Sequence, residues 1–247
     1  TVRTGESARV AALQLGRILV VGMIGNWITI ALVTFVGILP IANPFSTAVV
    51  FLTITEGFSH ERRRQQARLA CIYTAGVLIT FLLAGTLIMN FFGISLPGLR
   101  IAGGLIIARI GFGKLISDPE SEISEEAREE AVRKDDVAFT PLAMPMLSGP
   151  GAIAVTIGMA AEAEGVGENV AIILGILLVA FVSWLVLRAS RRVVVVLGAT
   201  GVNAMGRIMG FLLVCVGIQF VVNGTQQILS NPEFMAPILE AIRGRNP

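Results

Sequence analysis

Two short segments combine proline with glycine or small polar residues inside stretches that are otherwise apolar. The first contains Asn43, Pro44, Ser46 and Thr47, and the second contains Ser148, Gly149, Pro150 and Gly151. Proline lacks a backbone donor and its ring clashes with the preceding helical turn, so each segment should break a helix. A half-helix that begins after the break would direct free N–H groups and a positive dipole end towards a carboxylate or another anion. The glycines would let a ligand approach the backbone closely, and the hydroxyl groups offer hydrogen bonds.

The two segments occupy corresponding positions in the chain. Asn43 and Pro44 precede Gly149 and Pro150 by 106 residues (43 to 149), and a second match recurs at an offset of 107 (100 to 207). The second match pairs Arg100, Ile101, Gly103 and Leu105 with Arg207, Ile208, Gly210 and Leu212. Two independent matches at nearly the same offset predict an internal duplication. A lone proline would more simply be a helix kink, but the matched pair favours a binding site.

Three further polar residues lie inside apolar stretches. Arg109 precedes Lys114 by five positions, or about 8 Å along a helix, so its side chain could reach the membrane surface by snorkelling. The alternative is a role for Arg109 in substrate binding or gating. Gln219 and Asn223 are one helical turn apart and could either hydrogen-bond across helices or face a substrate.

The polar inventory of these stretches disfavours an enzyme. No Asp or Glu lies deep in an apolar stretch, and His60, the single histidine, stands beside Glu61 in a charged loop. Cys71 and Cys215 both lie in apolar surroundings and are interpreted as packing residues, not as a metal site. We therefore expect no cofactor. If transport were coupled to Na⁺ or H⁺, Na⁺ held by carbonyl and hydroxyl oxygens would fit better than a buried carboxylate relay for protons.

The composition predicts that these segments lie in a lipid bilayer. Of 247 residues, 54% are hydrophobic and 15% are charged, and the mean hydropathy is +0.79. A helix that crosses a bilayer needs about 20 apolar residues. Six stretches fit, namely Ile18–Thr55, Leu69–Phe92, Ile101–Ile116, Val137–Ala161, Val170–Leu187 and Ile208–Leu229. The expected fold is an all-α polytopic membrane protein with six transmembrane helices, of which the first and fourth are broken.

The distribution of basic residues predicts the orientation. Arginine and lysine concentrate in the first, third and fifth loops, which should be cytoplasmic, so both termini should lie outside. Because each half would cross three times, the second copy would enter from the opposite side, which makes two inverted three-helix repeats. The predicted divisions are an N-terminal extension (1–27), the first repeat (28–116), a charged cytoplasmic linker (117–136), the second repeat (137–232) and a C-terminal tail (233–247).

Four motifs in order carry a family resemblance. They are LPIANPFSTAVVFL (39–52), GISLPGLRIAGGLI (93–106), PLAMPMLSGPGAIA (141–154) and GRIMGFLLVCVGIQFVVNG (206–224). They resemble the MarC family of prokaryotic inner-membrane proteins, which is grouped with the lysine-exporter-like superfamily. The resemblance implies a multi-pass protein of the plasma membrane and, by similarity to SnatA-like members, transport of small neutral amino acids such as glycine and alanine. It places Asn43, Pro44, Gly149, Pro150 and Gly151 at the centre of the site.

The expected function is therefore secondary transport of small neutral amino acids by alternating access, with import or export left open. The alternatives are an efflux carrier for other small compounds and a non-transporting membrane scaffold or stress factor. The expected partners are the amino acids and the lipid bilayer, and a homo-oligomer is compatible with the sequence. Nucleic acid is not an expected partner, because the basic residues are dispersed among loops that also contain acids.

Overall fold

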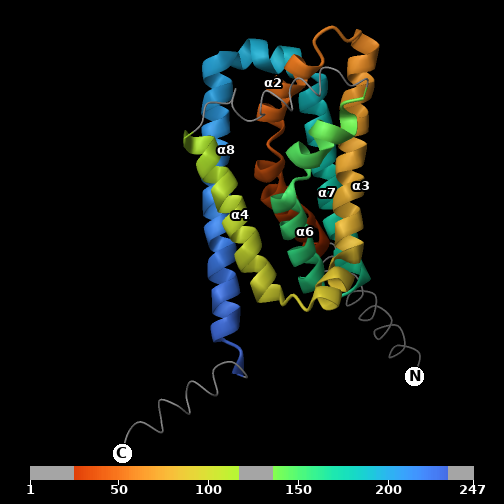
Figure 1. Ribbon diagram of the computed structural model, residues 1–247. Helices are drawn as coiled ribbons and strands as arrows, with labels where there is room; N and C mark the ends of the chain where they lie inside the picture. Colours follow the sequence, from red (N-terminus) through yellow and green to blue (C-terminus); the bar gives the residue numbers. More distant parts are fainter. Residues whose placement is uncertain (1–24, 117–135, 233–247) are drawn as a thin grey trace, which may run out of the picture.

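The computed structural model describes residues 25–116 and 136–232, and every regular element in those ranges is a helix (Figure 1). The first helix spans Gly25–Ala42 and is followed by α2 (Pro44–Ile54), α3 (His60–Phe92), α4 (Leu96–Ile116), the π-helix η2 (Ala138–Leu147), α6 (Pro150–Glu162), α7 (Val166–Arg188) and α8 (Ser190–Leu229). The all-α prediction is confirmed for this part of the chain. Most of the predicted N-terminal extension, nearly all of the linker and the C-terminal tail lie outside the described residues.

Four of the described helices are long and apolar enough to cross a membrane. They are the first helix, α3, α7 and the part of α8 from Thr200 to Leu229. The pair formed by η2 and α6 could be a fifth span, bent by 64° at its break. α4 is not among them, and it carries Arg100, Arg109 and Lys114. The described part of the chain therefore accounts for four or five of the six predicted crossings, and the inverted repeat stays a prediction.

The first break falls at Asn43, between the first helix and α2. Asn43 has φ 37° and ψ 64°, a left-handed conformation that asparagine adopts more readily than most residues. Its side-chain oxygen accepts a hydrogen bond from the Ser46 backbone N–H at 3.4 Å. Its amide group donates to Ser46 Oγ at 2.8 Å. Asn43 therefore ends one helix and caps the next.

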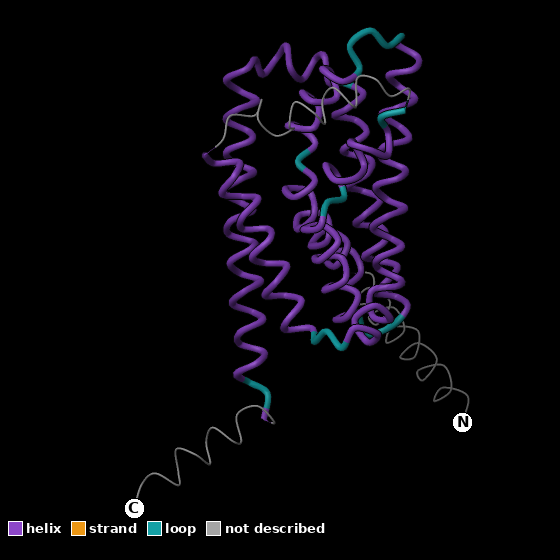
Figure 2. The backbone as a smooth tube through the Cα atoms, viewed as in Figure 1, coloured by secondary structure: helices purple, strands orange, loops and turns teal. Residues whose placement is uncertain are grey.

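The second break joins η2 to α6. Pro141 and Pro145 lie inside η2, where Thr140 and Met144 have extended backbone angles, since the residue before a proline is pushed out of the helical region. Ser148 and Gly149 then lead into α6, whose first residue is Pro150. Figure 2 shows both breaks as short loops near the middle of the bundle.

The two short helices that follow the breaks form the centre of the fold. In Figure 1, α2 and α6 lie between α3 and α7 on one side and α4 and α8 on the other. Both are rich in buried residues, including Phe51 and Ile54 in α2 and Val155 in α6. The residues at the two breaks, Asn43 and Ser148, are also buried, as an interrupted helix at membrane depth requires.

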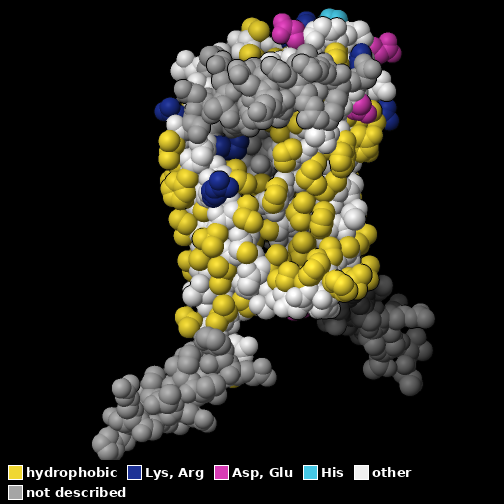
Figure 3. All heavy atoms as spheres, in the orientation of Figure 1, with side chains coloured by type: hydrophobic (Ala, Val, Ile, Leu, Met, Phe, Trp, Pro, Cys, Tyr) yellow, Lys and Arg dark blue, Asp and Glu magenta, His cyan; other side chains and the backbone are white. Residues whose placement is uncertain are grey.

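The outer surface is suited to lipid. Figure 3 shows a broad apolar band along the bundle, while histidine and most of the visible acidic side chains gather at one end. Large apolar side chains are exposed on several helices, including Leu87 of α3, Leu105 of α4 and Phe181 of α7. In water such a surface would be unfavourable, but in a bilayer it faces hydrocarbon.

Candidate functional site

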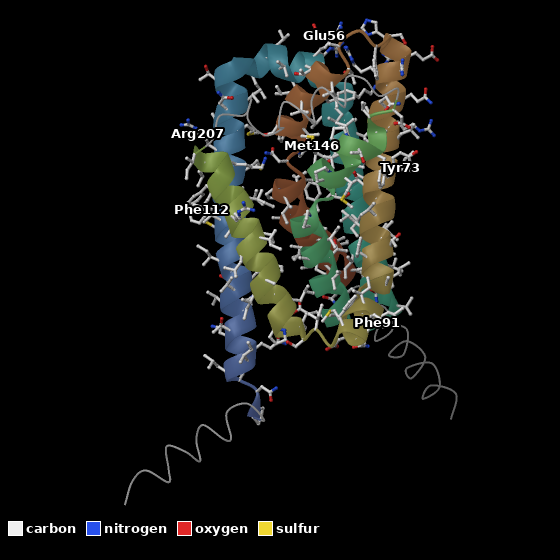
Figure 4. All side chains as sticks on the ribbon, in the orientation of Figure 1. Glu56, Tyr73, Phe91, Phe112, Met146 and Arg207 are labelled. Carbon is white, nitrogen blue, oxygen red and sulfur yellow. The ribbon has the colours of Figure 1, made fainter. Side chains whose placement is uncertain are left out.

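A cavity of about 360 Å³ lies where the two breaks meet α4. It is lined by Ile41, Ala42, Asn43, Thr47, Ile110, Gly113, Lys114, Pro145, Met146, Gly149, Pro150 and Gly151. Five of the eight residues predicted for the main site line this cavity, namely Asn43, Thr47, Gly149, Pro150 and Gly151. Figure 4 shows Met146, another lining residue, among the inner helices. The structure therefore brings together two segments that are about a hundred residues apart in the chain.

On the α2 side of the cavity, the polar groups of Asn43, Ser46 and Thr47 form hydrogen bonds with one another. Asn43 is only 2% exposed, and both its amide nitrogen and its amide oxygen bond to Ser46. Thr47 Oγ1 donates to the Asn43 carbonyl oxygen at 3.1 Å. In the first turn of α2, the Ser46 N–H is thus bonded by a side chain of the protein.

The α6 side is different, because its N-terminus has no side-chain cap. Gly149 stands at the cap position without a hydrogen-bonding side chain, and Gly149, Pro150 and Gly151 all line the cavity. The first N–H groups of a helix have no partner within the helix, and they carry its positive dipole end. The start of α6 is therefore the better of the two helix ends for binding a carboxylate.

Glycine is required at the start of α6 by close packing. A Cβ atom on Gly149 would lie 2.5 Å from the Pro145 carbonyl oxygen, which is inside the contact limit. A Cβ atom on Gly151 would lie 3.1 Å from Ile107 Cγ1 and 3.4 Å from Ile41 Cγ2. The two glycines allow α6 to begin directly against η2 and α4.

Three predicted site residues do not line the cavity. Pro44 is buried, and Ser46 is occupied by its bond to Asn43. Ser148 is fully buried, and its Oγ donates to the Ala143 carbonyl oxygen at 2.8 Å. Both serine hydroxyl groups form hydrogen bonds next to a break in the helix, so in this structure they help to shape the cavity wall.

Lys114 lines the cavity, although it was not among the site residues predicted from the sequence. Its half-buried side chain comes from the last turn of α4 and lines the cavity together with Ile110, one turn earlier. It is the only charged residue in the cavity wall among the described residues. Ile110 and Lys114 are four residues apart and so lie on one helical face, and this spacing is the feature of the sequence that could have predicted Lys114 as a lining residue.

The three secondary candidates lie away from the cavity. Arg109 is exposed on α4, on a face that does not line the cavity. Gln219 Nε2 donates to Asn223 Oδ1 at 2.7 Å, so these two side chains bond to each other along α8. That bond lies within one helix, and the two expected roles, a contact across helices and a substrate contact, stay predictions.

Comparison with known proteins agrees with this architecture. The family described as "MarC family integral membrane protein" matches residues 28–229. The chain belongs to the MarC family. The relatives named inner membrane protein MarC from Salmonella typhimurium, Citrobacter koseri and Escherichia coli are each 40% identical over 203 residues, which cover 78% of this chain and 92% of the relative. No solved structure matches the chain.

Membership in the MarC family confirms the resemblance carried by the four motifs, and the matched region includes both breaks and all of the cavity. Together with the apolar helices, the inner-membrane relatives place this MarC-family chain in the inner membrane as a multi-pass protein. Among the described residues, no group of three or more His, Cys, Asp or Glu side chains could hold a metal ion.

Proposed function

We propose that this chain is a secondary transporter of small neutral amino acids, with its binding site in the cavity between the two breaks. The supporting observation is the uncapped start of α6 in a cavity of about 360 Å³, near the lower limit of small-molecule sites. In the proposal, the substrate carboxylate binds the first N–H groups of α6 and is attracted by Lys114.

Another part of the cavity lining suits the ammonium group of an amino acid. The first helix ends at Ile41 and Ala42, which line the cavity, and the C-terminal end of a helix carries a partial negative charge. A zwitterion would then lie between the negative end of the first helix and the positive end of α6. Among the described residues, the lining contains no aromatic side chain, which supports a small substrate over a large apolar drug.

Alternating access would follow from the repeated architecture. In this proposal α4 is the third of six crossings and packs beside α8, the sixth, and the two halves rock about the cavity. Both termini would face outside, as the basic loops indicate. Coupling to Na⁺ would rely on carbonyl and hydroxyl oxygens, because the cavity lining has no carboxylate in the part of the chain that the structure describes.

Counterflow of labelled alanine and glycine in proteoliposomes tests the proposal. We expect counterflow by the parent protein, a loss of more than tenfold in Asn43→Leu and Gly149→Leu, and a smaller loss in Lys114→Gln. Gly76→Ala is the matched control, because a Cβ atom there meets nothing within 4 Å. Sodium and pH gradients are applied separately to identify the coupling ion.

Absence of alanine and glycine counterflow from folded parent protein under every gradient would overturn the amino-acid proposal. Transport of larger apolar compounds under the same conditions would instead support an efflux carrier. A protein that carries neither and tolerates leucine at position 149 would be a scaffold.

A further inference from the structure

Six arginines gather at one end of the bundle, away from the central cavity. They lie on the first turns of α3 and around the junction of α7 with α8, and we refer to them as the arginine cleft: Arg63, Arg64, Arg68, Arg188, Arg191 and Arg192. They line three neighbouring hollows of about 390, 110 and 670 Å³, all of which include Arg64 and Arg188. Among the described residues that line these hollows, Glu61 is the one carboxylate and His60 the one histidine.

In the described part of the chain, the acidic side chains close to this positive charge include Glu61, which lines one hollow, and Glu56, which interacts electrostatically with Arg63. Within the described part of the chain, no ion pair joins any of these six arginines to an acid. Arg63 donates to the hydroxyl and carbonyl oxygens of Thr55, and Arg188 stacks on the Trp184 ring at 5.2 Å. Like charges held this close repel one another, and an anionic ligand would relieve that repulsion.

The arginine cleft continues directly into the apolar surface. Leu185 lines the same hollow as Arg188 and is 44% exposed. Phe181 lies one turn earlier in α7 and is also exposed. The first part of α8 lies across the end of the bundle before the helix turns at Gly198 (Figure 1). That part exposes Val195 and Val196 close to Arg191 and Arg192, which is typical of a segment at the level of lipid headgroups.

We propose that the arginine cleft binds the phosphate group of an anionic membrane phospholipid. Guanidinium groups hold phosphate oxygens in paired hydrogen bonds, and basic pockets between membrane helices bind such headgroups. The acyl chains would lie along Leu185 and Phe181, which a free phosphate ion has no means to contact. Trp184 lies at the same level, as aromatic residues at a membrane interface commonly do. The site is separate from the proposed transport cavity.

Trp184 gives a local reporter of binding. The chain has two tryptophans, so Trp27→Phe leaves Trp184 alone. In this background, quenching of Trp184 fluorescence is titrated in detergent with brominated phosphatidylglycerol, brominated phosphatidylcholine of the same chain length, and inorganic phosphate as a competitor. The test variant is Arg64→Gln with Arg68→Gln, which share the largest hollow with Trp184. The matched control is Arg109→Gln with Arg207→Gln, two exposed arginines outside the cleft.

We expect phosphatidylglycerol to quench at a lower mole fraction than phosphatidylcholine, and the test variant to bind it about 30-fold more weakly, while the control is unchanged. Equal quenching by the two lipids, or unchanged binding in a test variant that keeps the thermal stability of the parent, would overturn the proposal. Complete competition by millimolar inorganic phosphate would also overturn it, because the site would then serve a soluble anion. If the test variant fails to fold, Arg192→Gln, judged by the same two criteria, replaces it.

Discussion

At the level of single residues, Asn43 and Gly149 both stand at the cap position after a break in a helix, but they do so in different ways. Each ends a helix at membrane depth and starts another one. Asn43 does so with a left-handed backbone and a side chain that caps α2. Gly149 has ordinary backbone angles and is required because Pro145 leaves no room for a Cβ atom. Substitutions at the two positions should therefore fail for different reasons.

At position 43, the contributions of the backbone and of the cap can be separated. Asn43→Gly keeps the left-handed conformation and loses the cap, so we expect stability to fall by at most about 1 kcal/mol. Asn43→Ala loses the cap and also adds the cost of a left-handed alanine, for a total of about 2 to 3 kcal/mol. Unfolding in SDS or by heat measures both. Equal losses in the two variants would contradict the left-handed conformation.

At position 149, the smallest possible side chain should already be damaging. A Cβ atom 2.5 Å from the Pro145 oxygen forces η2 and α6 apart, so we expect Gly149→Ala to lose about 1 to 3 kcal/mol of stability. Gly113→Ala is the comparison, because Gly113 lines the same cavity and a Cβ atom there meets nothing within 4 Å. It should keep the parent's stability. If Gly149→Ala had the same unfolding temperature as the parent protein, the close approach of Gly149 to the Pro145 carbonyl oxygen would be contradicted.

At the level of elements, glycines hold α4 and α8 together. A Cβ atom on Gly104 would lie 2.5 Å from the Gly217 carbonyl oxygen, and one on Gly111 would lie 2.7 Å from that of Gly210. Small residues let helix backbones approach in lipid, where apolar side chains gain little by leaving hydrocarbon for protein. The packing of α4 on α8 therefore depends more on the complementary shape of the two helix surfaces than on the burial of apolar side chains.

Adding a single methyl group at the contact tests whether α4 and α8 depend on this close approach. Gly217→Ala would place Cβ 2.5 Å from the Ala108 nitrogen and the Gly104 oxygen, so we expect α4 and α8 to separate, with a loss of about 1 to 3 kcal/mol. Gly76→Ala, on α3, adds the same group with nothing within 4 Å and should not destabilise the protein. Thermal unfolding in detergent compares the two. Similar melting temperatures for both variants would argue against close packing of α4 on α8.

At the level of the whole molecule, the charge distribution predicts one orientation. Glu61, beside the arginine cleft, should be cytoplasmic, and Glu164, between α6 and α7, should be outside. We expect an impermeant thiol reagent to label Glu164→Cys in intact cells and Glu61→Cys only after permeabilisation. Cys71→Ala with Cys215→Ala provides the background, since these are the two native cysteines. The reverse pattern would invert the topology and place the arginine cleft outside.

The sequence by itself determined the helical, lipid-facing character of this protein and the positions of its two breaks. Apolar content over long stretches leaves a chain in lipid few options other than helices, because every backbone group must be satisfied internally. Proline acts through its own ring on the turn before it, so the breaks at Pro44 and Pro150 could be predicted without knowledge of any neighbour.

Only the tertiary structure decided which polar groups share a cavity. Thr47, Lys114 and Gly149 come from separate parts of the chain and line one cavity, because α4 packs on α6 and α2 packs on η2. Ser46 and Ser148 have the same chemistry as Thr47, and all three hydroxyl groups form hydrogen bonds within the protein, but of the three only Thr47 lines the cavity. The direction of a hydroxyl group depends on the helix phase and on the helices packed against it. Residue type and spacing along the chain do not contain that information.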